Sequence, residues 1–193
     1  MNDPRLDPAK SLLLVVDIQE RLMPAISPED SELLIAASQL LIKAAQIFGV
    51  PVLLSEQYPK GLGPTIEPIS KTLEATLPIA KTEFSCWQNP ALNARIQSLQ
   101  RSQIVVCGIE AHICVLQSAL DLSSAGFSVF IAADGIGSRN PFDKSIALRL
   151  AEKGNVLIST AETVAFQWAG KAGTPEFKAL SKLLSQNRIE SLN

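Results

Sequence analysis

Short apolar runs alternate with longer helical patterns along this chain, and that alternation limits its fold more than any other feature. Runs typical of buried strands occur at residues 12–17, 52–55, 79–81, 103–107, 127–132 and 156–158. Apolar residues recur at helical spacing over residues 31–48, 92–99, 112–125 and 142–153, and the tail is helical from Ala161 and again from Pro175. Residues 56–77 are predicted to be rich in loops. The alternation predicts an α/β fold, with three α/β/α layers around a mostly parallel, six-stranded, Rossmann-like sheet.

Composition narrows the class of protein. The 193 residues suit a single domain over 1–193, and 47% of them are hydrophobic, which is enough for a sizeable core. The formal net charge is −2 without a cluster of Lys and Arg, so no nucleic-acid partner is expected. No apolar run reaches the roughly 20 residues that span a bilayer, and no signal peptide is seen, so no membrane partner is expected. The three cysteines lack a disulfide framework, which predicts a cytoplasmic protein.

Polar residues gather where the predicted strands end. In open parallel sheets, ligands bind outside the carboxyl ends of the strands. The residues at these ends, which we expect to converge on one edge of the sheet, are Asp17 with Gln19, Glu56, Gln57, Tyr58, Lys81, residues 108–114 and Asp134.

Cys114 is the residue in this set that best indicates chemistry. It lies near the start of the helix predicted over residues 112–125, just after a strand that Gly108 ends. A helix N-terminus presents unpaired N–H groups and about half a positive charge, which favours the thiolate, the nucleophilic form of cysteine. The alternative is a buried cysteine that acts as a small apolar residue. Cys107 is predicted in the core, and Cys86 in a loop or a packing position.

Asp17 and Lys81 also end predicted strands, and each has two interpretations. Asp17 could cap its loop or form a salt bridge there, or it could act as a base whose pKa depends on its surroundings. Lys81 could be a solvated loop residue or a cation beside Asp17 that stabilises a thiolate or carries a proton. The placement of Asp17, Lys81 and Cys114 at three strand ends favours acyl transfer from an amide-like substrate.

Metal and cofactor sites are not expected. His112 is the only histidine, and a zinc site needs about three or four ligands. His112 lies two residues from Cys114, so on a helix the two side chains point in different directions. The chain has neither a complete dinucleotide-binding glycine motif nor a phosphate-binding loop. A cysteine phosphatase would need an arginine six residues after the cysteine, where Leu120 stands.

Four segments resemble a known family. They are Val16-Asp17-Ile18-Gln19, Ala80-Lys81-Thr82, the segment from Gly108 to Cys114-Val115, and Ala133-Asp134-Gly135 with the following Ser138-Arg139. In this order and spacing they resemble the isochorismatase-like cysteine hydrolases, which include nicotinamidases and N-carbamoylsarcosine amidases. Residues 55–64 and 107–111 are most similar to the isochorismatase domain-containing protein branch.

The resemblance implies a role for each matching residue. Cys114 would be the nucleophile, Asp17 the general base, and Lys81 the residue that holds both in place and favours their charged forms. The peptide bond between Ile109 and Glu110 would be cis, and the backbone N–H groups of Glu110 and Cys114 would form an oxyanion hole.

This chain differs from two groups within the family, and the differences narrow the expected reaction. Nicotinamidases carry a metal site rich in Asp and His, which this chain cannot reproduce with His112 alone, and enzymes that hydrolyse isochorismate lack the nucleophilic cysteine. We therefore expect an amidohydrolase for a small-molecule substrate that acts on non-peptide C–N bonds without metal or cofactor. The alternative is a non-catalytic binding or assembly protein that retains the triad. The expected pocket-lining residues are Gln19, Tyr58, Phe84, Trp87 and His112, and a homo-oligomer, a dimer or larger, is expected.

Overall fold

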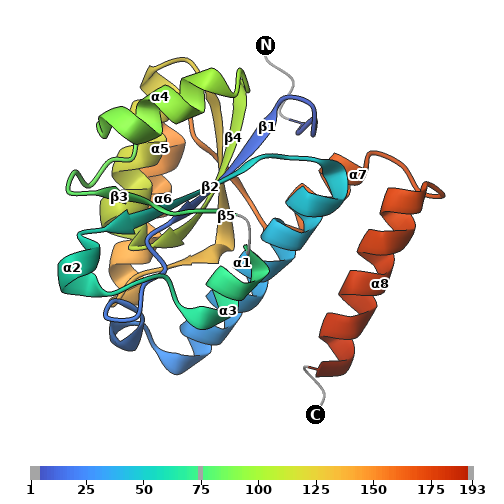
Figure 1. The fold of residues 1–193 in the computed structure, drawn as a ribbon, viewed down its shortest axis with the longest axis horizontal. Coiled ribbons are helices and arrows are strands. Elements are labelled where there is room, and N and C mark those ends of the chain that lie inside the picture. The colour runs from blue at the N-terminus through green and yellow to red at the C-terminus, as the bar shows by residue number, and fades with distance from the viewer. Residues whose placement is uncertain (1–4, 74–75, 191–193) are drawn as a thin grey trace.

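Six parallel strands form the centre of the molecule. The computed structural model describes residues 5–73 and 76–190 (Figure 1). The strands are β1 (Ser11–Val16), β2 (Val52–Gln57), β3 (Ile79–Lys81), β4 (Gln103–Ile109), β5 (Ser128–Gly137) and β6 (Leu157–Ser159). They pair in the order β3-β2-β1-β4-β5-β6, and every neighbouring pair is parallel. The predicted α/β class and six-stranded sheet are confirmed.

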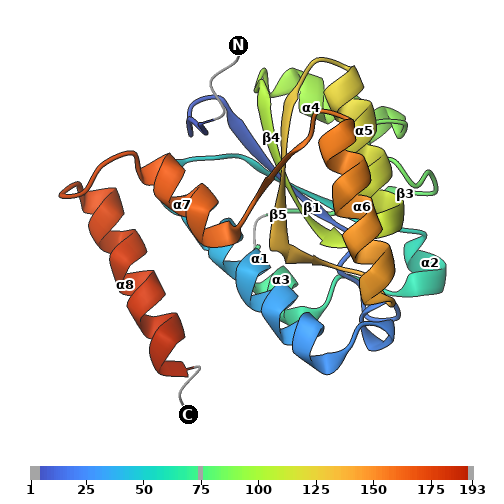
Figure 2. The same cartoon turned by 180° about the vertical axis from the view of Figure 1, so that it is seen from behind.

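Helices cover both faces of this sheet, as Figures 1 and 2 show from opposite sides. One face carries α1 (Pro28–Phe48), α3 (Glu67–Thr72), α7 (Ala161–Ala169) and α8 (Pro175–Glu190), and the other carries α4 (Pro90–Ser98), α5 (Leu116–Ser124) and α6 (Pro141–Lys153). Successive strand residues point to opposite faces. Leu13 and Val15 therefore pack in the first core, whereas Leu12 and Leu14 pack in the second. Residues 191–193 of the predicted tail lie outside the described part.

The long helix α1 starts earlier than its apolar pattern predicts. The Ser27 hydroxyl accepts a hydrogen bond from the Asp30 N–H, and Pro28 occupies the first turn, where its missing N–H costs nothing. The length and apolar composition of α1 alone would suffice to cross a membrane. Its apolar face instead packs in the core, where Leu34 and Leu41 are fully buried.

Three segments differ from the prediction in detail. The segment predicted as loop contains the short helices α2 (Pro59–Leu62) and α3. The predicted helix over residues 112–125 is divided into a π-helical turn, Ala111–Val115, followed by α5. Strand β5 extends five residues beyond the predicted end at residue 132, to Gly137, and its register against β4 shifts between Val106 and Gly108.

Candidate active site

The strand order reverses between β1 and β4, and this reversal locates the candidate site. In open parallel sheets, ligands bind at the carboxyl ends of the strands where the connections leave in opposite directions. β1 leads directly into Asp17, and β4 leads into Glu110 and the turn that carries Cys114. A Cβ on Gly108 would overlap the Val16 carbonyl, so only glycine allows the two strands to approach this closely.

Asp17 is fully buried, and both of its carboxylate oxygens accept hydrogen bonds. Ser55 Oγ donates to Oδ1 at 2.7 Å, and Lys81 Nζ donates to Oδ2 at 2.7 Å. The backbone of Asp17 is left-handed, with φ of 51°, and its N–H donates to the Ser55 carbonyl. A buried carboxylate requires partners of this kind because an unpaired charge in the interior is strongly disfavoured.

Lys81 connects the site through its ammonium group. Nζ lies within hydrogen-bonding distance of four acceptors: Asp17 Oδ2, Gln57 Oε1 at 2.6 Å, and the carbonyls of Glu83 and Phe84, each at 3.2 Å. Burial lowers the pKa of Lys81, but the negative charge of Asp17, with smaller contributions from Cys86 and Cys114, outweighs it, so the pKa is raised. An ammonium has only three N–H donors, so Lys81 is saturated by the protein and serves as a positioning group.

Cys114 lies in the π-helical turn with 6% of its surface exposed. Its thiol donates to Gln57 Oε1 at 3.9 Å, and the Asp17 carboxylate is a second acceptor within its reach. Burial, followed by the charge of Asp17, raises the thiol pKa, and Lys81 offsets only part of this rise. The helix start was expected to make this thiol easy to ionise, but its pKa is instead raised, because burial disfavours the thiolate.

Glu110 begins the turn of Cys114 and is held by Arg139. The peptide bond between Ile109 and Glu110 is cis. The Glu110 carboxylate accepts hydrogen bonds from the Arg139 backbone N–H and from its Nε and Nη2, the shortest at 2.6 Å. Burial of Glu110 disfavours its charge, but the contacts with Arg139 prevail and lower its pKa. This ion pair ties the start of the Cys114 turn to the segment that follows β5.

Gln57 is a site residue whose role the sequence analysis missed. Its Oε1 faces both Lys81 and Cys114, and its Nε2 donates to the Thr82 carbonyl at 2.8 Å. Gln19 braces the backbone of Gln57 by accepting from its N–H and donating to its carbonyl. The only sequence signal for Gln57 is its position at the end of β2.

Two of the expected pocket-lining residues have other roles. Gln19 is fully buried, and its amide is engaged by Gln57 and the Gly63 carbonyl, so it supports the site from behind. The Trp87 ring packs edge-to-face against Phe127, with centroids 5.5 Å apart. Phe127 precedes the amino end of β5, so Trp87 is directed away from the site.

The other three expected lining residues lie at the carboxyl edge. Tyr58 and Phe84 are 54% and 53% exposed; the Tyr58 N–H donates to the Lys81 carbonyl, and the Phe84 carbonyl accepts from Lys81 Nζ. His112 is half-buried, with Nδ1 2.9 Å from Ser138 Oγ. These positions are compatible with contact with a bound molecule.

Not every strand-end residue reaches the site. Asp17, Gln57, Lys81 and Cys114 converge as expected. Two carboxylates do not. Glu56 accepts from the N–H and hydroxyl of Thr65, whereas Asp134 accepts from the Ala161 N–H at the start of α7, because the shifted part of β5 directs it there.

Cys86 is a second buried thiol near Asp17. It is fully buried, and its sulfur is 3.6 Å from Ser55 Oγ, the hydroxyl that donates to Asp17. Within residues 5–73 and 76–190, no group of three or more His, Cys, Asp or Glu side chains is arranged to hold a metal ion.

Sequence comparison decides the family. Residues 11–162 match the isochorismatase domain. The chain belongs to the isochorismatase family. It is therefore a member of a family of hydrolases whose parallel α/β fold it shares.

Two relatives and one solved structure show how far the isochorismatase likeness extends. Isochorismatase domain-containing protein 2 of Homo sapiens is 37% identical, over 97% of this chain and 89% of its own length. Isochorismatase domain-containing protein 1 of Danio rerio is also 37% identical, over 96% of this chain but only 65% of its own length. The structure of MAR1 ribonuclease from Caenorhabditis elegans has a TM-score of 0.86 and 34% identity, and the match covers 93% of this chain and 91% of that chain.

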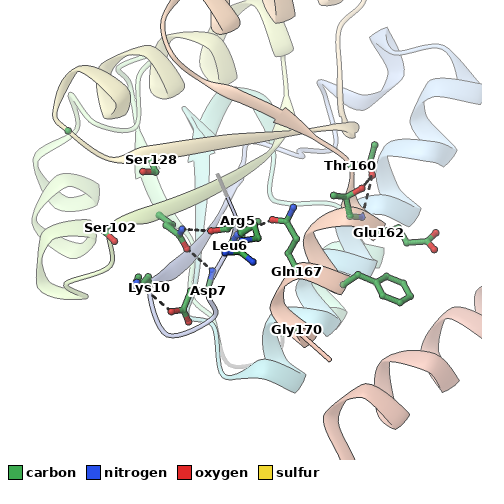
Figure 3. Close-up of a pocket in the computed structure, with 14 residues that line it drawn as sticks. Arg5, Leu6, Asp7, Lys10, Ser102, Ser128, Thr160, Glu162, Gln167 and Gly170 are labelled. Atoms are coloured by element: carbon green, nitrogen blue, oxygen red, sulfur yellow. Dashed lines mark hydrogen bonds and ion pairs between the residues drawn. The ribbon is translucent and has the colours of Figure 1, made fainter. Parts of the chain in front are cut away.

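A separate groove lies at the opposite, amino end of the sheet (Figure 3). It has a volume of about 1150 Å³ and lies between the residue 5–10 segment, the starts of β4 and β5, and α7. The Gln167 side chain accepts from the Leu6 N–H there. None of the residues predicted to act in catalysis lines this groove.

Proposed function

We propose that this chain is a cysteine hydrolase that cleaves a small amide-like C–N bond through a thioester on Cys114. The observation that carries this proposal is a single buried network. Lys81 Nζ binds the Asp17 carboxylate and Gln57 Oε1, and the Cys114 thiol contacts the same Gln57 oxygen. A nucleophile, a base and a cation, which acyl transfer requires, thus meet at the point where the strand order reverses.

The raised thiol pKa suggests how the reaction begins. The resting thiol keeps its proton, and the ion-paired Asp17 carboxylate accepts it as Sγ attacks the carbonyl carbon. An S–C bond forms, and the backbone N–H groups of Glu110 and Cys114 donate to the developing oxyanion. The C–N bond then breaks, and the leaving nitrogen takes the proton from Asp17.

Hydrolysis of the thioester completes the cycle. Water attacks the thioester carbon, Asp17 accepts a proton from the water, and the C–S bond breaks. The proton returns to the sulfur, and the carboxylic acid leaves. All of these steps use side chains and backbone groups of the chain itself, so we propose a metal-independent reaction.

The test is an ammonia-release screen with primary amides and N-carbamoyl amino acids. The wild type should release ammonia from at least one compound, and Cys114→Ala should lower that rate by about a thousandfold or more. Cys107→Ala is the matched control, because Cys107 is a buried thiol in the opposite core, and its rate should not change. Dialysis against EDTA should not alter the wild-type rate.

An RNA substrate belongs in the same screen because one structural relative is named a ribonuclease. Only 6% of the Cys114 surface is exposed, which favours small substrates. Turnover that persists in Cys114→Ala, or RNA cleavage in place of ammonia release, would contradict the proposal. Absence of turnover together with an unreactive Cys114 would instead favour a non-catalytic binding protein.

A further inference from the structure

Hydrogen bonds to the nitrogen and to the oxygen of the Gln57 side-chain amide fix its orientation. Nε2 donates to the Thr82 carbonyl at 2.8 Å, and Oε1 accepts from Lys81 Nζ at 2.6 Å. A flipped amide would place its NH2 group against the ammonium and its oxygen against the carbonyl, which would replace two favourable contacts with two repulsive ones. Gln57 therefore presents an oxygen, and not an N–H, to the space beside Cys114.

This oxygen loses a donor when the nucleophile is activated. A carbonyl oxygen can accept two hydrogen bonds, and those of Oε1 come from Lys81 and the Cys114 thiol. Once the thiol proton has moved to Asp17, the second lone pair faces a thiolate with no donor. A buried acceptor without a donor is unfavourable, and Gln57 is buried.

We infer that Gln57 determines specificity, because its Oε1 accepts a hydrogen bond from the N–H of the scissile amide. A substrate whose carbonyl carbon lies in attacking position near Sγ holds its leaving group beside this oxygen, 3.9 Å from the sulfur. A primary or secondary amide supplies the missing donor, whereas an ester or tertiary amide places an oxygen or an alkyl group there. The substrate class is therefore an amide with an N–H on its leaving nitrogen. This inference rests on the proposed function.

Acylation of Cys114 tests this inference. The probes are the primary amide found in the ammonia-release screen, its N,N-dimethyl amide and its methyl ester, which Sγ attacks at the carbonyl carbon as ammonia, dimethylamine or methanol leaves. The rate of thioester formation on Cys114 is measured by rapid acid quenching and intact mass with peptide mapping, and is divided by the rate at which hydroxide hydrolyses the same probe. The normalised wild-type rate should favour the primary amide by about tenfold over each of the other two.

Gln57→Met should abolish this preference, because methionine fills similar space without the oxygen. The matched control is Gln97→Met, an exposed residue of α4, which should keep the preference. Wild-type Cys114 that reacts with all three probes at equal normalised rates would overturn the specificity role and leave the cysteine mechanism standing. A preference that persists in Gln57→Met would also overturn it. A Cys114 that reacts with none of the probes would overturn both proposals.

Discussion

The two ends of the parallel sheet differ in how they use buried polar groups. At the carboxyl end, Asp17 and Lys81 form an ion pair with both side chains fully buried, and Cys114 lies in the same network. At the amino end, the buried polar side chains Ser11 and Gln103 are uncharged and are hydrogen-bonded. Gln103 donates to the Arg5 carbonyl and accepts from a backbone N–H, beside the groove of about 1150 Å³.

This difference indicates where function and stability reside. A buried ion pair costs desolvation that its mutual attraction repays only in part, so it contributes little net stability and is best explained by chemistry. Neutral side-chain hydrogen bonds that join the residue 5–10 segment to β4 stabilise the fold. We therefore place the active site at the carboxyl end and not in the large groove at the amino end.

Loss of the proton acceptor should have the largest effect at the carboxyl end. Asp17→Asn keeps the shape of the side chain but removes the group that takes the Cys114 proton. We expect kcat/KM to fall by about 10²–10⁴-fold for any amide found in the screen. A value within twofold of wild type would show that Asp17 is not the base.

Removal of the Lys81 cation should destabilise the folded chain. Lys81→Met leaves the Asp17 carboxylate buried without its ion partner, which should lower the free energy of unfolding by about 3–5 kcal/mol in urea titrations. The double variant with Asp17→Asn should be more stable than Lys81→Met alone. If the two losses simply add, the pair is not energetically coupled.

A substitution at the amino end of the sheet should lower stability without changing activity. Gln103→Leu removes the acceptor of the Asp7 N–H and the donor to the Arg5 carbonyl, so the free energy of unfolding should fall by about 1–3 kcal/mol. The value of kcat/KM, measured below the unfolding transition, should not change. A tenfold loss of kcat/KM would contradict the separation of the two ends.

High pH should destabilise the fold through its buried thiols, none of which lines the amino-end groove. Burial raises the pKa of Cys107 from 9.0 to about 12. A raised folded pKa contributes stability that is complete below pH 9 and is lost as the pH rises from 9 to 12, by about 1 kcal/mol per pH unit. Urea titrations between pH 8 and 10.5 should show this decline, and Cys107→Ala should make it shallower.

The sequence predicts the sheet and the central site because both follow from local patterns. Apolar runs locate the strands, and the rule that ligands bind at strand ends brings Asp17, Lys81 and Cys114 together. Trp87 could not be placed this way, because its partner Phe127 is distant in sequence. Asp134 could not either, because the register shift in β5 has no sequence signature.

Burial and contact partners account for the remaining differences. The helix start suggested an easily ionised Cys114, but its ionisation depends on desolvation that only the folded chain reveals. Gln57 is an uncharged strand-end residue, and its role emerges only from its contacts with Lys81 and Cys114. The short helices α2 and α3 lie in a segment where proline and glycine favour loops.

A covalent thioester between Cys114 and the substrate distinguishes the proposed mechanism from direct hydrolysis by water. The most direct measurement is rapid acid quenching of the wild type during turnover of an amide from the screen, followed by intact mass and peptide mapping. We expect an added mass equal to the acyl group, located on Cys114 and absent from Cys114→Ala. Turnover without an adduct, or with the adduct on Cys86, would contradict it.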